Sequence, residues 1–160
     1  MSMRKTGNWT GISRLMGTLP QTLEDARRLS LRRWSLKAEA VAKAHMSAQD
    51  LGWTALKSKT VAAKLKKGQS ELILIATSSY FQSITSWATT DKALAGVKKG
   101  TVGKDGQIVD VVARTHEFGS STKNIPARPL WKPTLDETMR WHHRNNRPEY
   151  LFIIAAKKQL

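Results

Sequence analysis

The apolar positions in the first third of the chain follow the spacing of a helix. From about Thr22 to Leu51 no glycine or proline interrupts the pattern, and Gly52 provides a natural C-terminal cap. The residues that share one face are Leu23, Ala26, Trp34, Ala38, Val41, His45 and Ala48. The stretch therefore predicts one long helix, with Thr22 and Asp25 at its start as a loose capping box.

A shorter amphipathic piece precedes this helix. Its apolar residues Trp9, Ile12, Leu15 and Met16 also recur at helical spacing. The sequence Thr18-Leu19-Pro20 follows, and a proline inside a helix removes one backbone hydrogen bond. We therefore predict a break near Pro20, with residues 1–8 forming a flexible arm.

The middle of the chain carries shorter patterns. Residues 53–67 predict a loop that closes as a short basic helix stopped by Gly68, and residues 80–84 predict a helical turn. Residues 72–76 are apolar without alternation, which fits either a buried strand or the buried side of a turn.

Two strands and a glycine-rich tip are predicted next. Residues 84–90 and 94–99 form the strands, which join near Asp91. Residues 100–106 contain three glycines and predict a flexible hairpin tip.

The last third returns to helical patterns. We predict a helix from Val109 that ends at Gly119, although its valines also suit a strand. A second helix with Pro133 in its first turn should run to about His143. Residues 150–156 are apolar and fit either a final helix or an added strand. The predicted fold class is α+β, with a long N-terminal helix, a small antiparallel sheet in the middle, and one or two C-terminal helices.

Composition and charge limit the class of protein. The chain has 160 residues, enough for the single domain (1–160) that we predict, with residues 148–160 as a candidate C-terminal extension. It has no cysteine and therefore no disulfide or thiolate metal site. No apolar run reaches the ~20 residues of a membrane span, and no apolar core follows the charged N-terminus as in a secretory signal.

The net charge of +15 attracts polyanions. Residues 1–67 hold fourteen Lys or Arg against four Asp or Glu, a net charge of +10. The lysines expected to contact DNA or an acidic partner are Lys57, Lys59, Lys64, Lys66 and Lys67. No aromatic residues are interleaved with them, so any DNA contact should depend on phosphate charge alone; a solvated surface is the simpler alternative.

Two prolines close together punctuate the chain at residues 125–130. Pro126 and Pro129 each fix their own φ and restrict the residue before them, which excludes a helix or a central strand here. We therefore predict a rigid elbow that presents Arg128 and Trp131 in a set direction. Trp131 suits an interface, with packing beneath the loop as the alternative.

This region resembles a known family. Two motifs separated by a loop carry the resemblance: His116-Glu117-Phe118-Gly119 and Ile125-Pro126-Ala127-Arg128-Pro129. They are similar to motifs of the neck or tail-completion proteins of tailed bacteriophages, including the virion-morphogenesis proteins of Mu-like phages. The resemblance covers roughly residues 53–135. Three further segments match the family pattern: one with Trp53, Leu56, Lys57, Ser58 and Thr60, the motif Thr77–Ile84, and Ala95-Gly96-Val97. Ser78 stands where the family usually has glycine, and serine tolerates a positive φ poorly.

The resemblance implies a structural virion protein at the head–tail junction or the top of the tail. Its copies would form a ring, six in number with twelve as the alternative, in contact with adaptor, stopper, tail-terminator or tail-tube proteins and with exiting DNA. The protein would be found in the virion, and in the host cytoplasm during assembly. The residues expected at subunit or partner interfaces are Arg114, His116, Phe118, Ile125, Pro126, Arg128 and Trp131.

A free-standing basic nucleic-acid-binding protein is the main alternative. An enzyme is not expected, because the adjacent His116 and Glu117 point about 100° apart on a helix and no nucleophile motif accompanies them. Neither a cofactor nor a metal site is expected, because His142 and His143 are neighbours rather than a pair four residues apart.

Overall fold

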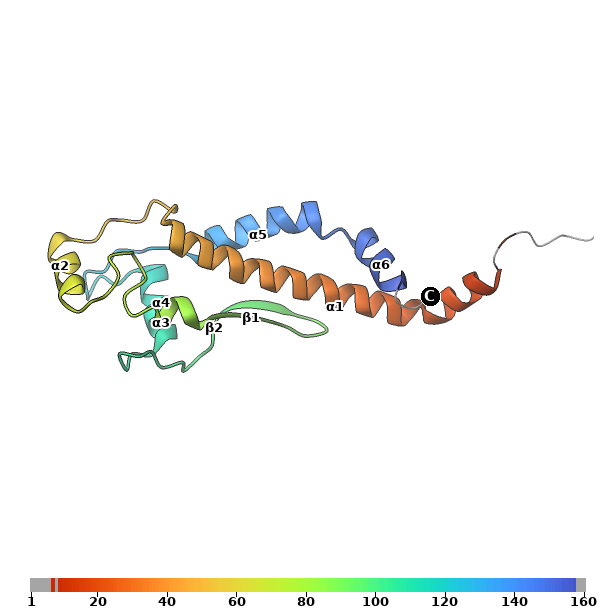
Figure 1. The fold of residues 1–160 in the computed structure, drawn as a ribbon, viewed down its shortest axis with the longest axis horizontal. Helices are drawn as coiled ribbons and strands as arrows, with labels where there is room; N and C mark the ends of the chain where they lie inside the picture. The colour runs from red at the N-terminus through yellow and green to blue at the C-terminus, as the bar shows by residue number, and fades with distance from the viewer. Residues whose placement is uncertain (1–6, 8, 158–160) are drawn as a thin grey trace, which may run out of the picture.

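A single long helix forms the spine of the molecule. The computed structural model describes Gly7 and residues 9–157, so the predicted arm lies outside the described residues except for Gly7. Helix α1, Trp9–Ala48, has 40 residues and is about 60 Å long (Figure 1).

The predicted break at Pro20 is wrong, because α1 passes through it. Pro20 lies on the exposed side of the helix, and the hydroxyls of Thr18 and Thr22 each donate to a carbonyl one turn earlier, at Arg14 and Thr18. Thr22 is fully buried inside the helix and is not its N-cap, so the predicted capping box is also wrong.

Short elements follow in the predicted order. Helix α2 spans Ser58–Lys66 and helix α3 spans Ser79–Ser83. Strands β1, Ile84–Ala88, and β2, Ala93–Val97, pair antiparallel with Trp87 opposite Leu94. Between α2 and α3, residues 72–76 form turns, so the turn alternative holds and the strand does not.

The C-terminal third is helical throughout. Helix α4 spans Val109–Phe118, α5 spans Trp131–Asn145, and α6 spans Pro148–Lys157. Residues 150–156 are therefore helical rather than a strand, and Leu151 is buried in the α6 helix, which packs on α1.

The elements are layered around α1. Helices α5 and α6 lie along one side of it and the β-hairpin lies along the other (Figure 1). Asn146, which is buried just after α5, donates to the backbone carbonyl and hydroxyl of Ser30 in α1 at 3.0 and 2.9 Å. On the other side, the Ser86 hydroxyl of β1 donates to Glu39 of α1 at 2.6 Å. Hydrogen bonds from Lys43 and Ser86 lower the pKa of Glu39.

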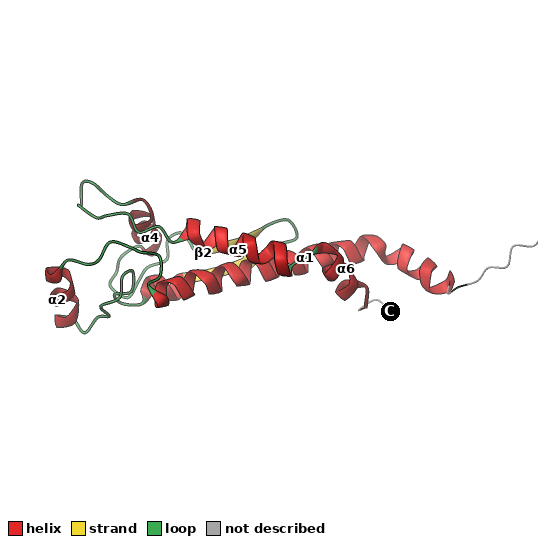
Figure 2. Ribbon diagram, turned by 90° about the horizontal axis from the view of Figure 1, so that it is seen from above, coloured by secondary structure: helices red, strands yellow, loops and turns green. Residues whose placement is uncertain are grey.

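The main core lies at the C-terminal end of α1. It joins α1, α3, β1, α4 and the start of α5 through the buried residues Ala42, Met46, Tyr80, Ile84, Val109, Ala113 and Leu130. The N-terminal turns of α1 project beyond α6, and α2 lies at the opposite extremity of the molecule (Figures 1 and 2).

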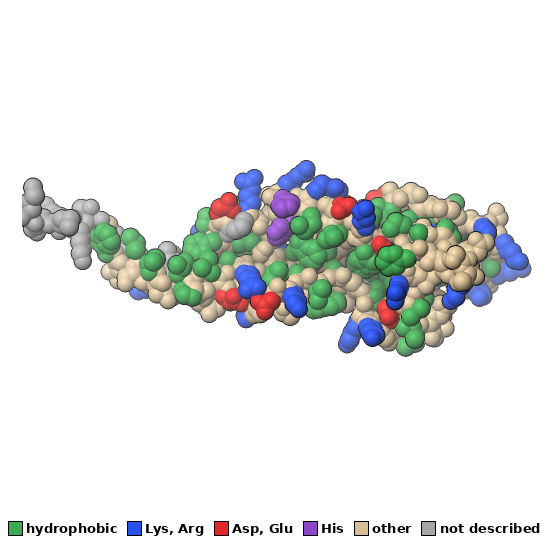
Figure 3. Space-filling view, turned by 180° about the vertical axis from the view of Figure 1, so that it is seen from behind, with side chains coloured by type: hydrophobic (Ala, Val, Ile, Leu, Met, Phe, Trp, Pro, Cys, Tyr) green, Lys and Arg blue, Asp and Glu red, His purple; other side chains and the backbone are tan. Residues whose placement is uncertain are grey.

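The molecule exposes much more surface than a compact protein of its size. Its accessible surface is 11205 Å², whereas a compact monomer of 17.9 kDa would expose about 8000 Å². Apolar side chains are exposed along the projecting part of the molecule (Figure 3). In the first half of α1, Trp9, Ile12, Met16 and Leu23 are each at least half exposed. The surface of the molecule is therefore large relative to its core.

Ser78 adopts the conformation that the resemblance assigns to glycine. Its φ of 62° and ψ of 1° place it in the left-handed region immediately before α3. We expect Ser78→Gly to raise the free energy of unfolding by about 0.5–1 kcal/mol, because the side-chain clash of that region is removed. Chemical denaturation would measure the gain. Asn124→Gly is the control: Asn124 has φ 50°, but asparagine tolerates this region, so little change is expected. A loss of stability in Ser78→Gly would contradict the assignment of strain.

Candidate assembly site

The predicted elbow is hydrogen-bonded to the end of α4 and to the residues that follow it. The backbone N–H of Arg128 donates to the carbonyl of His116 at 2.6 Å, and Ser120 and Ile125 exchange two backbone hydrogen bonds at 2.8 and 2.9 Å. The end of α4 is thereby fastened to the segment that leads into α5. We call residues 116–131 the clasp.

Gly119 lies where the two halves of the clasp come closest. Its φ of 75° and ψ of 177° form a backbone conformation that is almost restricted to glycine. A Cβ atom at this position would lie 2.9 Å from the Ala127 nitrogen and 3.0 Å from the Ile125 carbonyl oxygen. The glycine of the His-Glu-Phe-Gly motif is therefore needed both for its conformation and for the close approach.

Glu117 caps helix α5 from a distance in sequence. Its carboxylate accepts the N–H of Leu130 at 2.8 Å and the N–H of Trp131 at 3.2 Å. These groups begin α5 and have no partner within the helix, and the positive end of the helix dipole favours a carboxylate there. Glu117 thus has a structural role in the clasp. Sequence reasoning missed it because the cap comes from thirteen residues upstream.

Arg128 points into the subunit, so its predicted outward presentation is wrong. The residue is 5% exposed, and its Nε and Nη2 both donate to the carbonyl of Thr54 at 3.2 Å. Burial lowers the pKa of the Arg128 guanidinium. Beside it, the Trp53 indole donates to the Pro129 carbonyl at 2.9 Å. The clasp is therefore bound to the segment before α2.

Trp131 packs inward as well. It is half-buried against the main core, which corresponds to the packing alternative rather than to a displayed side chain. His116 is half-buried, and its Nδ1 has no hydrogen-bond partner among the described residues.

The outer face of α4 is what the clasp leaves exposed. Phe118 is 77% exposed, the largest value among the exposed large apolar residues of the described chain, and Val111 and Ile108 are about half exposed. At 100° per residue, Val111, Arg114 and Phe118 fall within one arc of about 60°, whereas Val109 and Ala113 are buried on the other side. Ile108 directly precedes the helix and lines the same groove as Val111. The set Ile108, Val111, Arg114, Thr115 and Phe118 is called the α4 face below.

A shallow groove of about 330 Å³ adjoins the α4 face. It lies between α4 and the clasp loop, and Ile108, Val111, Lys123 and Ile125 are among its lining residues. Pro126 is exposed beside it. Of the predicted interface set, the structure thus brings Arg114, Phe118, Ile125 and Pro126 to the surface. Ile108 and Val111 were missed, although their spacing from Phe118 could have revealed them.

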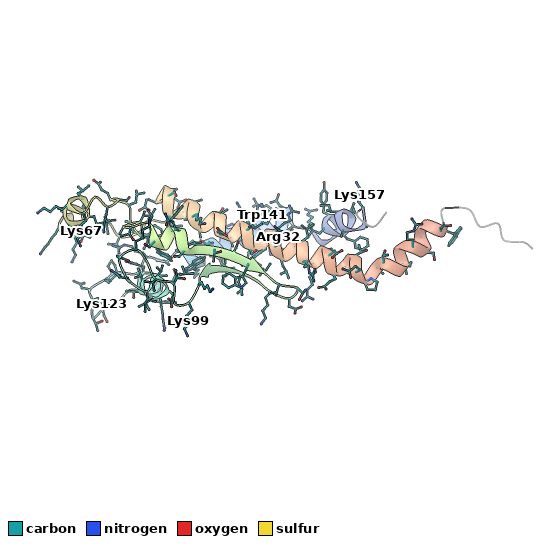
Figure 4. The ribbon with its side chains drawn as sticks, turned by 60° about the horizontal axis from the view of Figure 1, so that its bottom comes forward. Arg32, Lys67, Lys99, Lys123, Trp141 and Lys157 are labelled. Carbon is teal, nitrogen blue, oxygen red and sulfur yellow. The ribbon has the colours of Figure 1, made fainter. Side chains whose placement is uncertain are left out.

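The predicted lysine set is divided by the structure. Lys57, Lys59, Lys66 and Lys67 are exposed. Lys64 is half-buried and donates its Nζ to the carbonyls of Leu72 and Ile75 at 2.6 and 3.1 Å, so it is not displayed with the other lysines of this set. Burial and the charge of Arg128 lower the pKa of Lys64. Lys67, Lys99 and Lys123, from three separate segments, lie toward the same end of the molecule (Figure 4).

No cluster of three metal-ligating side chains occurs in the described part of the chain. His45 hydrogen-bonds to Asp50 at 2.8 Å, and His142 lies 2.9 Å from the amide of Asn146. None of the helices over residues 9–157 is both long enough and apolar enough to cross a membrane.

Burial and the charge of Arg128 lower the pKa of His116 below its ordinary value of 6.5. The unfolded chain therefore binds the proton more readily, so this contribution to stability is present above about pH 6.5 and is lost as the pH falls toward the lowered pKa. We expect Tm to drop from pH 7.5 to 5.5, and to drop less in His116→Gln. His142, whose pKa burial also lowers, acts with the same sign in both proteins, so their difference isolates His116. Equal drops in Tm would contradict this assignment.

Comparisons with family models, with curated proteins and with solved structures found no match to this chain.

Proposed function

We propose that this chain is a structural virion protein of a tailed bacteriophage. It would act at the head–tail junction or the top of the tail, where its copies form a ring that completes the neck or tail and allows head and tail to join. The observation that carries the proposal is that separate segments whose sequences resemble the phage family meet in the clasp. Trp53 and Thr54 bond to Pro129 and Arg128, and Glu117 and Gly119 close the unit.

The shape of the molecule supports a subunit rather than a free-standing protein. Its surface exceeds that of a compact monomer by about 3000 Å², on the estimate given above. The α4 face adds an exposed apolar patch on a helix that the clasp holds in place. Such a patch with a polar rim is typical of a protein–protein interface.

The mechanism would be assembly rather than catalysis. Glu117 is occupied as a helix cap, so its carboxylate does not form a reactive pair with the half-buried His116. In a ring, the α4 face of each copy would meet a different surface of its neighbour, a heterologous contact that closes after six or twelve copies. Other surfaces would meet the neighbouring neck or tail proteins.

The test is the particle mass of wild type and of Phe118→Asp, measured by light scattering over a range of concentrations, with and without isolated phage tails. We expect the wild type to form a discrete ring or to join tails stoichiometrically. The variant should keep its circular dichroism spectrum and Tm, because Phe118 contributes little to the subunit interior, but it should remain a monomer. Tyr150→Asp on α6 is the control for a similarly exposed aromatic residue elsewhere. A folded Phe118→Asp that assembles like the wild type would contradict the interface.

A basic nucleic-acid-binding protein is the second candidate. It is favoured by four exposed lysines in and directly beside α2, namely Lys57, Lys59, Lys66 and Lys67, with Lys99 and Lys123 toward the same end. Under this alternative, the isolated monomer should bind duplex DNA with a steep salt dependence and should ignore tails.

A further inference from the structure

A small cavity lies between α2, α3, α4 and the clasp. Its volume is about 240 Å³, and three basic side chains from three separate segments line it: Lys64, His116 and Arg128. Thr60, Ser79 and Tyr80 are among the other lining residues. The cavity is distinct from the α4 face, because the buried and exposed sides of α4 face in different directions.

Arg128 is a buried charge without a counter-ion. No ion pair joins it to a carboxylate in the described part of the chain, and its hydrogen bonds to Thr54 use only Nε and Nη2. Burying a charge is costly unless the charge is paired. A guanidinium also offers five N–H groups in a planar fork that matches an oxyanion. Nη1 therefore has no hydrogen-bond acceptor among the described residues, and Arg128 is one of the residues that line the cavity.

Lys64 adds to the positive potential of the cavity, and His116 places an imidazole in its wall. Arg128 lies near enough to both groups for its charge to lower the pKa of each. The Nδ1 atom of His116 is buried and has no hydrogen-bond partner among the described residues. Two carboxylates are close: Glu71 acts on Lys64 and Asp105 lines the cavity, but neither forms an ion pair with these groups in the described residues.

A second depression adjoins the cavity. Lys67 and Lys104 line it, and it shares Ala76, Thr77 and Asp105 with the cavity. Exposed lysines beside the cavity would concentrate anions from solution.

We propose that this cavity is an oxyanion-binding site that accepts one phosphate group. Arg128 would bind the phosphate oxygens through its free N–H groups, His116 would donate a further hydrogen bond, and Lys64 would contribute charge. The phosphate is either the free inorganic ion or a backbone phosphate of nucleic acid. The site belongs to the single subunit and does not rest on ring assembly.

The first experiment titrates the full chain with sodium phosphate at pH 7.0 against sodium chloride of equal ionic strength. We expect a saturable rise in Tm of roughly 3–6 °C when phosphate is tenfold above its Kd. In parallel, NMR should show the His116 ring protons shifting with the same Kd, since a bound anion favours the imidazolium. A Tm that follows ionic strength alone, with no saturable shift of His116, would overturn the proposal.

Variants locate the site. Arg128→Gln should weaken phosphate binding more than tenfold and His116→Gln several-fold, whereas Lys59→Met, an exposed change on the same helix as Lys64, should alter it less than twofold. If Arg128→Gln fails to fold, His116→Gln and Lys64→Met carry the test. Equal weakening in Lys59→Met would assign the effect to general surface charge and overturn the cavity.

A short DNA duplex distinguishes the two sources of phosphate. If the site takes a backbone phosphate, the duplex should displace inorganic phosphate and shift the His116 signals. If it takes the free ion, the duplex should leave the saturated His116 signals unchanged. Either result supports an oxyanion site and names its ligand.

Discussion

Replacing Gly119 with alanine is expected to lower the free energy of unfolding by about 3 kcal/mol or more. The backbone at φ 75° and ψ 177° is one that alanine adopts only under strain, at a cost of about 1–3 kcal/mol. The new Cβ would also meet two backbone atoms of the clasp at 2.9 and 3.0 Å, and backbone cannot rotate away as a side chain can. Thermal denaturation should show a Tm lower by roughly 6–12 °C.

Gly106→Ala separates the two causes of this loss. Gly106 has the same φ of 75°, but nothing lies within 4 Å of the atom that a substitution would add. We expect it to cost about 1 kcal/mol from conformation alone. A Gly119→Ala variant no less stable than Gly106→Ala would show that the clasp can open at this point without cost.

Replacing Glu117 with alanine is expected to cost about 2–3 kcal/mol. The change leaves the N–H groups of Leu130 and Trp131 without an acceptor, and Leu130 is fully buried, so water cannot easily replace the carboxylate. Glu117→Gln keeps one acceptor oxygen and should cost about 1 kcal/mol. Urea denaturation of the three proteins would measure both steps.

Glu149 provides the matched control for helix-end charge. It lies exposed in the first turn of α6 and accepts no hydrogen bond there among those described, so Glu149→Ala should cost less than about 0.5 kcal/mol. If Glu117→Ala were equally mild, the cap would contribute only as a charge. The proposal that Glu117 holds the clasp together would then fail.

The periodic elements could be predicted from the sequence because their signals are local. The hairpin turns at Asp91, and α4 begins at Val109 and ends before Gly119, as the spacing indicates. Pro20 misled the prediction because its local penalty was given more weight than the packing that keeps the rest of α1 helical. Residues 150–156 stayed ambiguous because propensity cannot show that a buried face of α1 is available to them.

The candidate site was less accessible to sequence reasoning. The exposed side of α4 follows from helical geometry, and Phe118 and Arg114 were expected there. The burial of Arg128 depends on a carbonyl at Thr54, 74 residues earlier in the chain, and no local pattern encodes such a contact. The same holds for Glu117, whose partners begin the next helix.

Because of the clasp, the conformational entropy of the α4 region is lost when the chain folds rather than when it binds a partner. Because Gly119, Glu117 and Arg128 fix the end of α4 within the molecule, the helix backbone that carries the outward side chains is already held in position. Association through a preorganised surface loses little further conformational freedom, so a modest apolar patch can support a useful affinity. The recruitment step would then resemble the docking of rigid bodies, with backbone shifts of about 1 Å or less around α4.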